Sequence, residues 1–325
     1  MAKSEDIVAI LNGDIKLEHA AIVQTLQHAY AMGGGKIGCE LEEIAREEMR
    51  HFKWLSEVVV ELGGDPTLER AEVYLDGGII ERLRKDMEDE EKAISLYKER
   101  RDTIDGPTVK AVYERIIADE EAHRDKYREI IEEIGGMPDE QAAVAPQSEA
   151  QKLYARLLNE DVKVEYTVIL RYLHQYFTTP NYKLAMELED QAQESMKHLG
   201  WLSEQVAKLG GSPTIEHSDL GLGGSEEEML RRNIELEHEA EVQYAKHIEL
   251  IEDPESKKVL SRIRDQETYH GGQFAELLGG AASGSDALES SVPGSEAEEK
   301  PDAKDEKPSP AGKLTVGSLL GKKQG

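Results

Sequence analysis

The sequence LNGDIKLE at residues 11–18 recurs as LNEDVKVE at residues 158–165, and this repetition decides the architecture. WLSE at residues 54–57 returns at 201–204, and GGDPT at 63–67 returns as GGSPT at 210–214. Each pair has the same spacing as residues 11 and 158, so residues 11–131 align with 158–278 without a gap. A repeat of this length indicates two copies of one structural unit.

Each copy contains four stretches whose apolar residues recur at intervals of three and four, which is the period of an α-helix. In the first copy these stretches cover residues 4–31, 38–62, 77–102 and 107–134, with Gly-rich or Pro-containing turns between them. The second and third stretches are joined by about fifteen residues, enough to cross the length of a four-helix bundle. The sequence therefore predicts an all-α fold of two tandem four-helix bundles, each with one long crossover.

The expected boundaries follow from changes in composition. We expect the first bundle over residues 1–136, a polar linker over 137–150 and the second bundle over 151–279. Residues 280–312 are rich in Ser, Ala, Gly, Pro, Glu, Asp and Lys and have almost no aliphatic side chains, so they are predicted to be a disordered acidic linker. A short apolar segment over residues 313–325 ends the chain.

The charge balance restricts the classes of partner. Lys and Arg number 39 against 67 Asp and Glu, giving a formal charge of −28 that disfavours phosphate backbones and anionic lipid and gathers cations. The single cysteine, Cys39, excludes an intrachain disulfide and a Cys-x-x-Cys iron site of the rubredoxin type. Residues 1–13 do not resemble a signal peptide, and no stretch is long and apolar enough to span a membrane. We expect a cytoplasmic protein with no nucleic-acid or membrane partner.

Two Glu-x-x-His pairs lie on different helices of the first copy. The spacing of three places both side chains of a pair on one helix face, and apolar residues such as Leu41 and Ile116 share those faces. On the remaining two helices, single acids lie in apolar stripes. The predicted inward-facing set is Glu18, Glu48, His51, Glu90, Glu120 and His123.

Four carboxylates in one apolar core would repel one another, so they must either take up protons or hold cations. Carboxylate and imidazole ligands suit iron or manganese, and one Glu from each of two helices with a Glu-x-x-His pair from each of the other two is the arrangement found in di-iron helical bundles. A lone Glu-x-x-His in so acidic a chain is more often solvated surface, and ELEH at 235–238 is an example arising by chance. Two copies with inward acids on every helix favour a metal pair.

With these residues the sequence resembles the bacterioferritin branch of the ferritin-like superfamily, in a tandem form, over nearly all of both repeats. The resemblance implies that the six residues form a ferroxidase centre in which Glu48 and Glu120 bridge two iron ions. It further implies that Fe(II) is oxidised by O2 or H2O2 and that Fe(III) leaves toward a mineral store, for iron storage or detoxification.

The second copy differs at one bridging position. It retains Glu165, His198, Glu237, Glu267 and His270, but Ser195 stands where the first copy has Glu48. Glu241 replaces Ile94 one turn after Glu237, so we expect it to restore the carboxylate count with changed geometry. The hypothesis is that the first copy is the catalytic site and the second a modified or weaker metal site.

Methionine at the position between the bridging Glu and the His ligates haem b between paired subunits in bacterioferritins, and Met49 and Met196 occupy it here. The resemblance therefore implies a possible haem site. Ordinary apolar packing between the two repeats, arranged as a pseudo-dimer, is the interpretation that we favour.

The last residues resemble an encapsulin cargo-loading peptide. In that family of peptides, small apolar residues at the end of a flexible tether press into a groove on the inner wall of the shell, which implies an encapsulin shell as partner. The alternative is a chance cluster of apolar residues in a disordered tail. The expected docking residues are Leu314, Thr315, Val316, Gly317, Ser318 and Leu319.

Three functions remain open at this point. The favoured one is an Fe(II) oxidase enclosed in an encapsulin compartment, as a homo-oligomer or an intrachain pseudo-dimer. A rubrerythrin-like enzyme that reduces peroxide would use the same residues. A non-catalytic iron-binding cargo would gather cations without oxidising them.

Overall fold

The computed structural model describes residues 4–32, 35–135 and 147–286, and in these ranges it has eight helices and no strand. This confirms the all-α prediction with two four-helix units. The helices are α1 (Ser4–Ala31), α2 (Lys36–Glu61), α3 (Ile79–Thr103), α4 (Pro107–Gly135), α5 (Glu149–Thr178), α6 (Tyr182–Lys208), α7 (Glu226–Leu250) and α8 (Pro254–Asp286).

Helix ends follow from local chemistry. Ser148 and Ser225 each accept a hydrogen bond from the third residue of the helix that follows, and that residue's side chain bonds back, which forms a capping box. Gly63 and Gly210 follow α2 and α6 with φ of 79°, where a residue with a Cβ would be strained. The repeat extends to these details, since Gly63 and Gly210 are equivalent positions.

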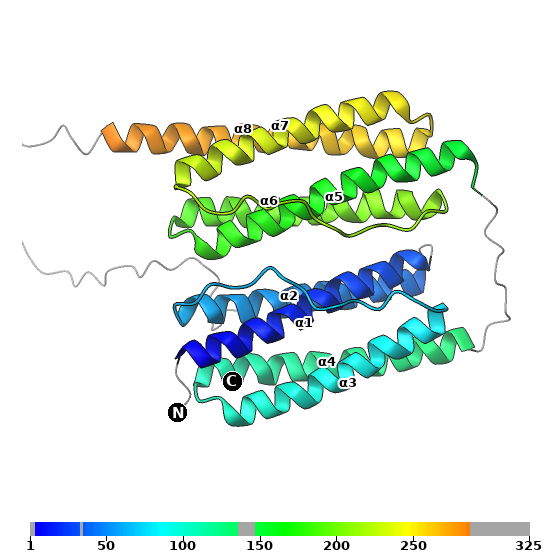
Figure 1. Ribbon diagram of the computed structural model, residues 1–325, viewed down its shortest axis with the longest axis vertical. Helices are drawn as coiled ribbons and strands as arrows, with labels where there is room; N and C mark the ends of the chain where they lie inside the picture. Colours follow the sequence, from blue (N-terminus) through cyan, green and yellow to red (C-terminus); the bar gives the residue numbers. More distant parts are fainter. Residues whose placement is uncertain (1–3, 33–34, 136–146, 287–325) are drawn as a thin grey trace, which may run out of the picture.

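Each crossover is anchored to the first helix of its own bundle. The Asn12 side chain donates to the Asp65 carbonyl and accepts from the Thr67 amide, while Asn159 bonds to Ser212 and Thr214 in the same way. Figure 1 shows both crossovers running across the same face of the molecule, in front of α1 and α5. We call this the crossover face.

The two bundles pack against each other through α1 and α2 on one side and α5 and α6 on the other (Figure 1). His19 and Tyr166, which are equivalent positions of the repeat, hydrogen-bond to each other and so meet at the pseudo-twofold axis. Phe52 packs on Phe177 with ring centroids 6.3 Å apart. The repeats therefore form an intrachain pseudo-dimer.

The predicted domain boundaries differ slightly from the observed helix ends. Because Ser148 caps α5, the second bundle begins two residues inside the expected linker. Helix α8 continues to Asp286, into the first residues of the segment predicted to be disordered. The rest of that segment and residues 313–325, with the proposed docking peptide, lie outside the described residues. No helix in the described ranges could cross a membrane.

Candidate metal centre

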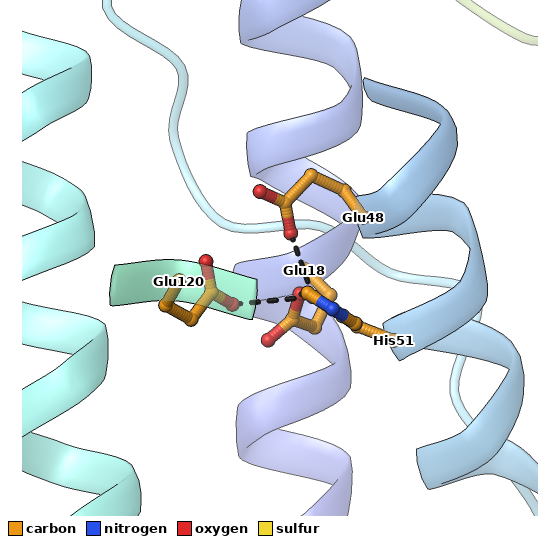
Figure 2. Close-up of side chains that lie close together, drawn as sticks. All are labelled: Glu18, Glu48, His51 and Glu120. Carbon is orange, nitrogen blue, oxygen red and sulfur yellow. Dashed lines mark hydrogen bonds and ion pairs between the residues drawn. The ribbon is translucent and has the colours of Figure 1, made fainter. Parts of the chain in front are cut away.

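The first bundle brings all six predicted ligands together. One carboxylate comes from α1, one from α3, and a Glu-His pair from each of α2 and α4, and every one of these side chains is buried. They form two overlapping groups, each of three carboxylates and one imidazole whose ligand atoms lie within 4.8 Å of one another. The groups are Glu18, Glu48, His51 and Glu120, drawn in Figure 2, and Glu48, Glu90, Glu120 and His123.

Each imidazole faces one of the two groups of carboxylates. His51 Nδ1 lies 3.1 Å from Glu48, 3.2 Å from Glu120 and 3.3 Å from Glu18. His123 Nδ1 lies 3.0 Å from Glu48 and 3.3 Å from Glu120, with Glu90 at 3.8 Å. Figure 2 shows the side chains around His51 converging from α1, α2 and α4. Because Glu48 and Glu120 face both imidazoles, they are placed to bridge two ions.

Carboxylates outside the cluster orient both imidazoles. His51 Nε2 lies 3.4 Å from Asp119, which also accepts from Arg115, and His123 Nε2 lies 2.8 Å from Glu47. A proton held on Nε2 by such a partner leaves Nδ1 free to ligate a metal. Sequence spacing did not reveal these partners, because each contact joins α2 to α4.

Three tyrosines that the sequence analysis did not identify donate hydrogen bonds to the candidate ligand carboxylates. The Tyr97 hydroxyl donates to Glu18, and in the second bundle the Tyr244 and Tyr172 hydroxyls donate to Glu165 and Glu237. Tyr97 and Tyr244 are equivalent positions, so this contact is part of the repeat. Each tyrosine hydroxyl holds in place a carboxylate that is not at a bridging position.

Without a cation, burial and charge set the protonation of the carboxyl groups. Burial, reinforced by the negative charge of Glu120, raises the pKa of both Glu18 and Glu90 well above its usual value. Burial also opposes ionisation of Glu48 and Glu120, but hydrogen bonds and the neighbouring imidazolium groups outweigh it and lower the pKa of both. Glu18 and Glu90 therefore favour the neutral form, and Glu48 and Glu120 favour the ionised form.

The imidazoles carry the compensating positive charge. Burial lowers the pKa of an imidazole, but the Glu120 carboxylate and its neighbours raise that of His51 well above the usual range. The Glu48 and Glu120 carboxylates overcome the same effect of burial at His123 and raise its pKa to about 11. Two carboxylates and two imidazolium groups give a cluster with no net charge.

The donor set fits a pair of divalent cations. Two buried carboxylate oxygens, Glu18 Oε2 and Glu48 Oε1, make no hydrogen bond of good geometry among the described residues and lie 3.3 Å and 3.0 Å from the Nδ1 atoms of His51 and His123, so a cation could take the place of these ion pairs. Four ionised carboxylates would balance two divalent ions, with both imidazoles neutral. The first bundle can thus exchange protons for cations and keep its core neutral.

The second bundle holds a reduced version of this cluster. It forms two groups of three, Glu165 with His198 and Glu267, and Glu237 with Glu267 and His270. Ser195 is buried at the missing bridging position, and its hydroxyl has no hydrogen-bond partner in the described part of the chain. Three carboxylates cannot neutralise two divalent ions, so this site is one negative charge short.

The structure does not place Glu241 in that cluster, contrary to the sequence-based expectation. Its side chain is 36% exposed and lies 3.5 Å from His238, which is 73% exposed. A glutamate one turn from Glu237 starts near the inward face, but its three rotatable bonds let the carboxylate reach water. The charge missing at Ser195 is not restored by this residue.

Met49 and Met196 are half-buried in the apolar cluster that extends across both bundles. The same cluster contains Phe52 and Phe177, whose rings pack across the interface. Both methionines therefore take part in apolar packing. Haem binding stays a prediction, which a Soret band in the purified protein would establish.

The fold and the carboxylate-imidazole cluster define a helical-bundle protein of the ferritin-like class. The ferritin-like domain family matches this chain twice, at residues 8–147 and 155–282, so the chain belongs to that family and carries two copies of its domain.

Two further matches each cover part of the chain. It is 28% identical over 144 residues to a bacterioferritin of Desulfovibrio desulfuricans, a match covering 41% of this chain and 78% of the relative. A crystal structure of ferritin-like, diiron-carboxylate proteins from Bacillus anthracis str. Ames matches with 26% identity and a TM-score of 0.38, over 40% of this chain and 99% of the other. Both matches have about the length of one bundle.

Proposed function

We propose that the first bundle oxidises Fe(II) to Fe(III), and that the protein serves iron storage or detoxification. The observation that carries this proposal is the pair of overlapping ligand groups that share Glu48 and Glu120. Two Fe(II) ions held side by side can deliver two electrons to one oxidant. The similarity to a bacterioferritin supports the same reaction.

The overall reaction balances with an external oxidant. Two Fe(II) ions lose one electron each, and the two electrons with two protons convert O2 to H2O2 or, with H2O2 as the oxidant, yield two waters. The bridging carboxylates hold both ions, while Glu18 and Glu90 each complete one of the two positions. Ionised carboxylates stabilise the higher charge of Fe(III), which favours electron loss.

The test is stopped-flow absorbance after anaerobic Fe(II) loading and mixing with oxidant. Glu48→Ala removes a bridge and should slow oxidation by about a hundredfold or more, because loss of even an outer-shell partner of a metal ligand costs about 10- to 100-fold. Ser195→Ala changes the equivalent position of the second bundle and should leave the rate nearly unchanged. Undiminished oxidation in Glu48→Ala would refute the assignment of the first bundle.

The same experiment separates the rival functions. A protein that only binds iron shows no oxidised absorbance after mixing. An enzyme of the rubrerythrin kind reacts much faster with H2O2 than with O2 at equal concentration. An anaerobic titration gives the number of Fe(II) ions per chain, and we propose that the second bundle binds more weakly because Ser195 leaves it short of a carboxylate.

We further propose that the protein works as cargo inside an encapsulin shell in the cytoplasm. The support is the similarity of residues 314–319 to shell-docking peptides, together with the acidic tether before them. A single short peptide binds weakly, so several copies on an oligomeric cargo would add avidity. Deleting residues 313–325 should release the protein from co-expressed shells, and continued enclosure would contradict this role.

A further inference from the structure

The two bundles differ in how their ligand clusters connect to the surface. In the first bundle a cavity of about 240 Å³ lies between α1 and α3 and reaches all four ligand carboxylates. Small side chains line it, among them Ala20, Ala21 and Thr25. The acids Glu72 and Asp89 lie along it, and the lysines Lys85 and Lys92, which also line it, both pair with Asp89. This cavity lies on the crossover face and offers a cation an acidic path to the cluster.

Larger residues occupy the equivalent positions of the second bundle. Thr167 and Val168 replace the two alanines, and Tyr172 replaces Thr25 and donates its hydroxyl to Glu237. Leu236 replaces Asp89, and the buried guanidinium of Arg171 replaces the neutral Gln24. Bulk and the buried guanidinium both oppose the approach of a cation from the crossover face, although Glu239 replaces Lys92 at an exposed position.

The second bundle has instead a hollow of about 790 Å³ between α6 and α8, on the opposite side from its crossover face. His270 of the ligand cluster lines it, and so does Gln191, which is 4% exposed and whose Oε1 has no partner among the described residues. Arg262, the one cationic side chain of the lining, stacks on Trp201 at 4.1 Å. The acids of the lining are Glu187, Asp190, Glu194 and Asp265.

The first bundle has different side chains at the place that corresponds to this hollow. Ile44 replaces Gln191, and Lys126 replaces Gln273 and binds Glu40 at 3.0 Å. Glu47 pairs with Arg50 and also lies 2.8 Å from His123, whereas its counterpart Glu194 pairs with Lys197 and Gln266 and has no described contact of this kind with His270. The first bundle thus has an apolar side chain and a lysine where the hollow has two amides, although Ala118 and Ala122 stand where the hollow has Asp265 and Tyr269.

We propose that the two bundles load divalent cations from opposite faces of the molecule. The first loads through the cavity between α1 and α3, and the second through the α6–α8 hollow, where carboxylates and the Gln191 carbonyl oxygen receive the ion before it reaches His270. The proposal rests on the metal centres of the proposed function and adds the routes that supply them.

The chain contains its own reporters for the two centres. Trp54 and Trp201, its two tryptophans, each lie with the ring centroid 5.7 Å from that of a ligand histidine, His51 and His198 respectively. A paramagnetic ion bound at either histidine quenches the adjacent tryptophan. In full-length Trp54→Phe protein the remaining fluorescence reports the second bundle, and in Trp201→Phe protein it reports the first.

The experiment follows fluorescence quenching by Co(II) in a stopped-flow instrument. Gln191→Ile with Gln273→Lys gives the hollow the residues that the first bundle has at these two positions. It should slow quenching of Trp201 about tenfold or more, which is the scale on which local charge changes association rates. Quenching of Trp54 should keep its rate. The matched control, Ala21→Val with Thr25→Tyr, should slow quenching of Trp54 and leave Trp201 unaffected.

Gln273→Lys alone, at a partly exposed position, provides a second variant if the double replacement fails to fold, and it should slow Trp201 quenching in the same direction. An unchanged Trp201 rate in either variant would overturn the proposed route. The two single-tryptophan proteins without any route substitution give a further test. If Co(II) quenches Trp54 but not Trp201, the proposed route to the second bundle is overturned, while the proposed oxidation in the first bundle stands. If Co(II) quenches neither tryptophan, neither cluster binds a cation, and the proposed function is refuted as well.

Discussion

Loading the first bundle with two divalent cations should release about four protons near neutral pH. The neutral carboxyls of Glu18 and Glu90 must each lose a proton to become ligands, and the imidazolium groups of His51 and His123 must do the same. The cluster then exchanges four protons for two doubly charged ions, and its net charge stays at zero.

The second bundle should release fewer protons. Burial, reinforced by the charge of Glu267, raises the pKa of Glu165 and Glu237, and neighbouring carboxylates outweigh burial at His198 and raise its pKa to about 10. These groups supply about three protons per pair of ions, and the loaded site keeps an uncompensated positive charge. Its affinity for a second ion should therefore be lower.

The assay is an anaerobic titration with Zn(II), which is redox-inert, in weakly buffered solution with a pH indicator dye. His198→Ala with Glu267→Ala disables the second bundle, so that the first is observed alone. Because the groups involved hold protons near pH 7, cation affinity should rise steeply with pH. A release of one proton or none would mean that these acids are already ionised and in contact with water, which would refute the buried, neutral cluster.

Three further predictions concern single side chains. Ser195→Glu supplies the missing bridge in the second bundle and should add one tightly bound Co(II) per chain in calorimetric titrations; an unchanged stoichiometry would show that the site is limited elsewhere. Tyr97→Phe removes the hydroxyl that donates to Glu18 and should weaken Co(II) binding to the first bundle about tenfold, measured by Trp54 quenching in the Trp201→Phe background. Burial raises the pKa of Glu57, at the interface between the bundles, from 4.5 to about 7, so its contribution to stability is complete below pH 4.5 and falls by up to about 3 kcal/mol as pH rises to 7. Glu57→Gln should flatten the apo protein's urea-unfolding free energy over that range, and an unaltered slope would contradict the assignment.

The ligands of the first bundle could be predicted because helix periodicity alone fixes which face a residue occupies. Glu48 and His51 are three apart on one helix, as are Glu120 and His123, so an apolar stripe that includes them must point inward. The repeat strengthened the prediction, because equivalent positions in the second copy carry the same side chains except at Ser195. The structure brings together the groups that this pattern implies.

Features that depend on the rotation and offset of one helix against another could not be predicted. The contacts of Asp119 with His51 and of Glu47 with His123 each join α2 to α4, and sequence spacing gives neither the rotation nor the axial offset between these helices. The prediction for Glu241 was wrong for a different reason. The helical period places its Cα atom, but it does not place the carboxylate at the end of the side chain. Helix ends shifted by one or two residues, as at α5, are within the fraying of real helices.

The pairing at the pseudo-twofold axis has a consequence for how such a protein can change. In a symmetric dimer of identical subunits, any substitution appears twice, so losing one bridging carboxylate would damage both centres at once. Here His19 meets Tyr166 instead of a copy of itself. Covalent fusion has released the two halves from that constraint, so Ser195 could arise in one half while Glu48 was kept in the other.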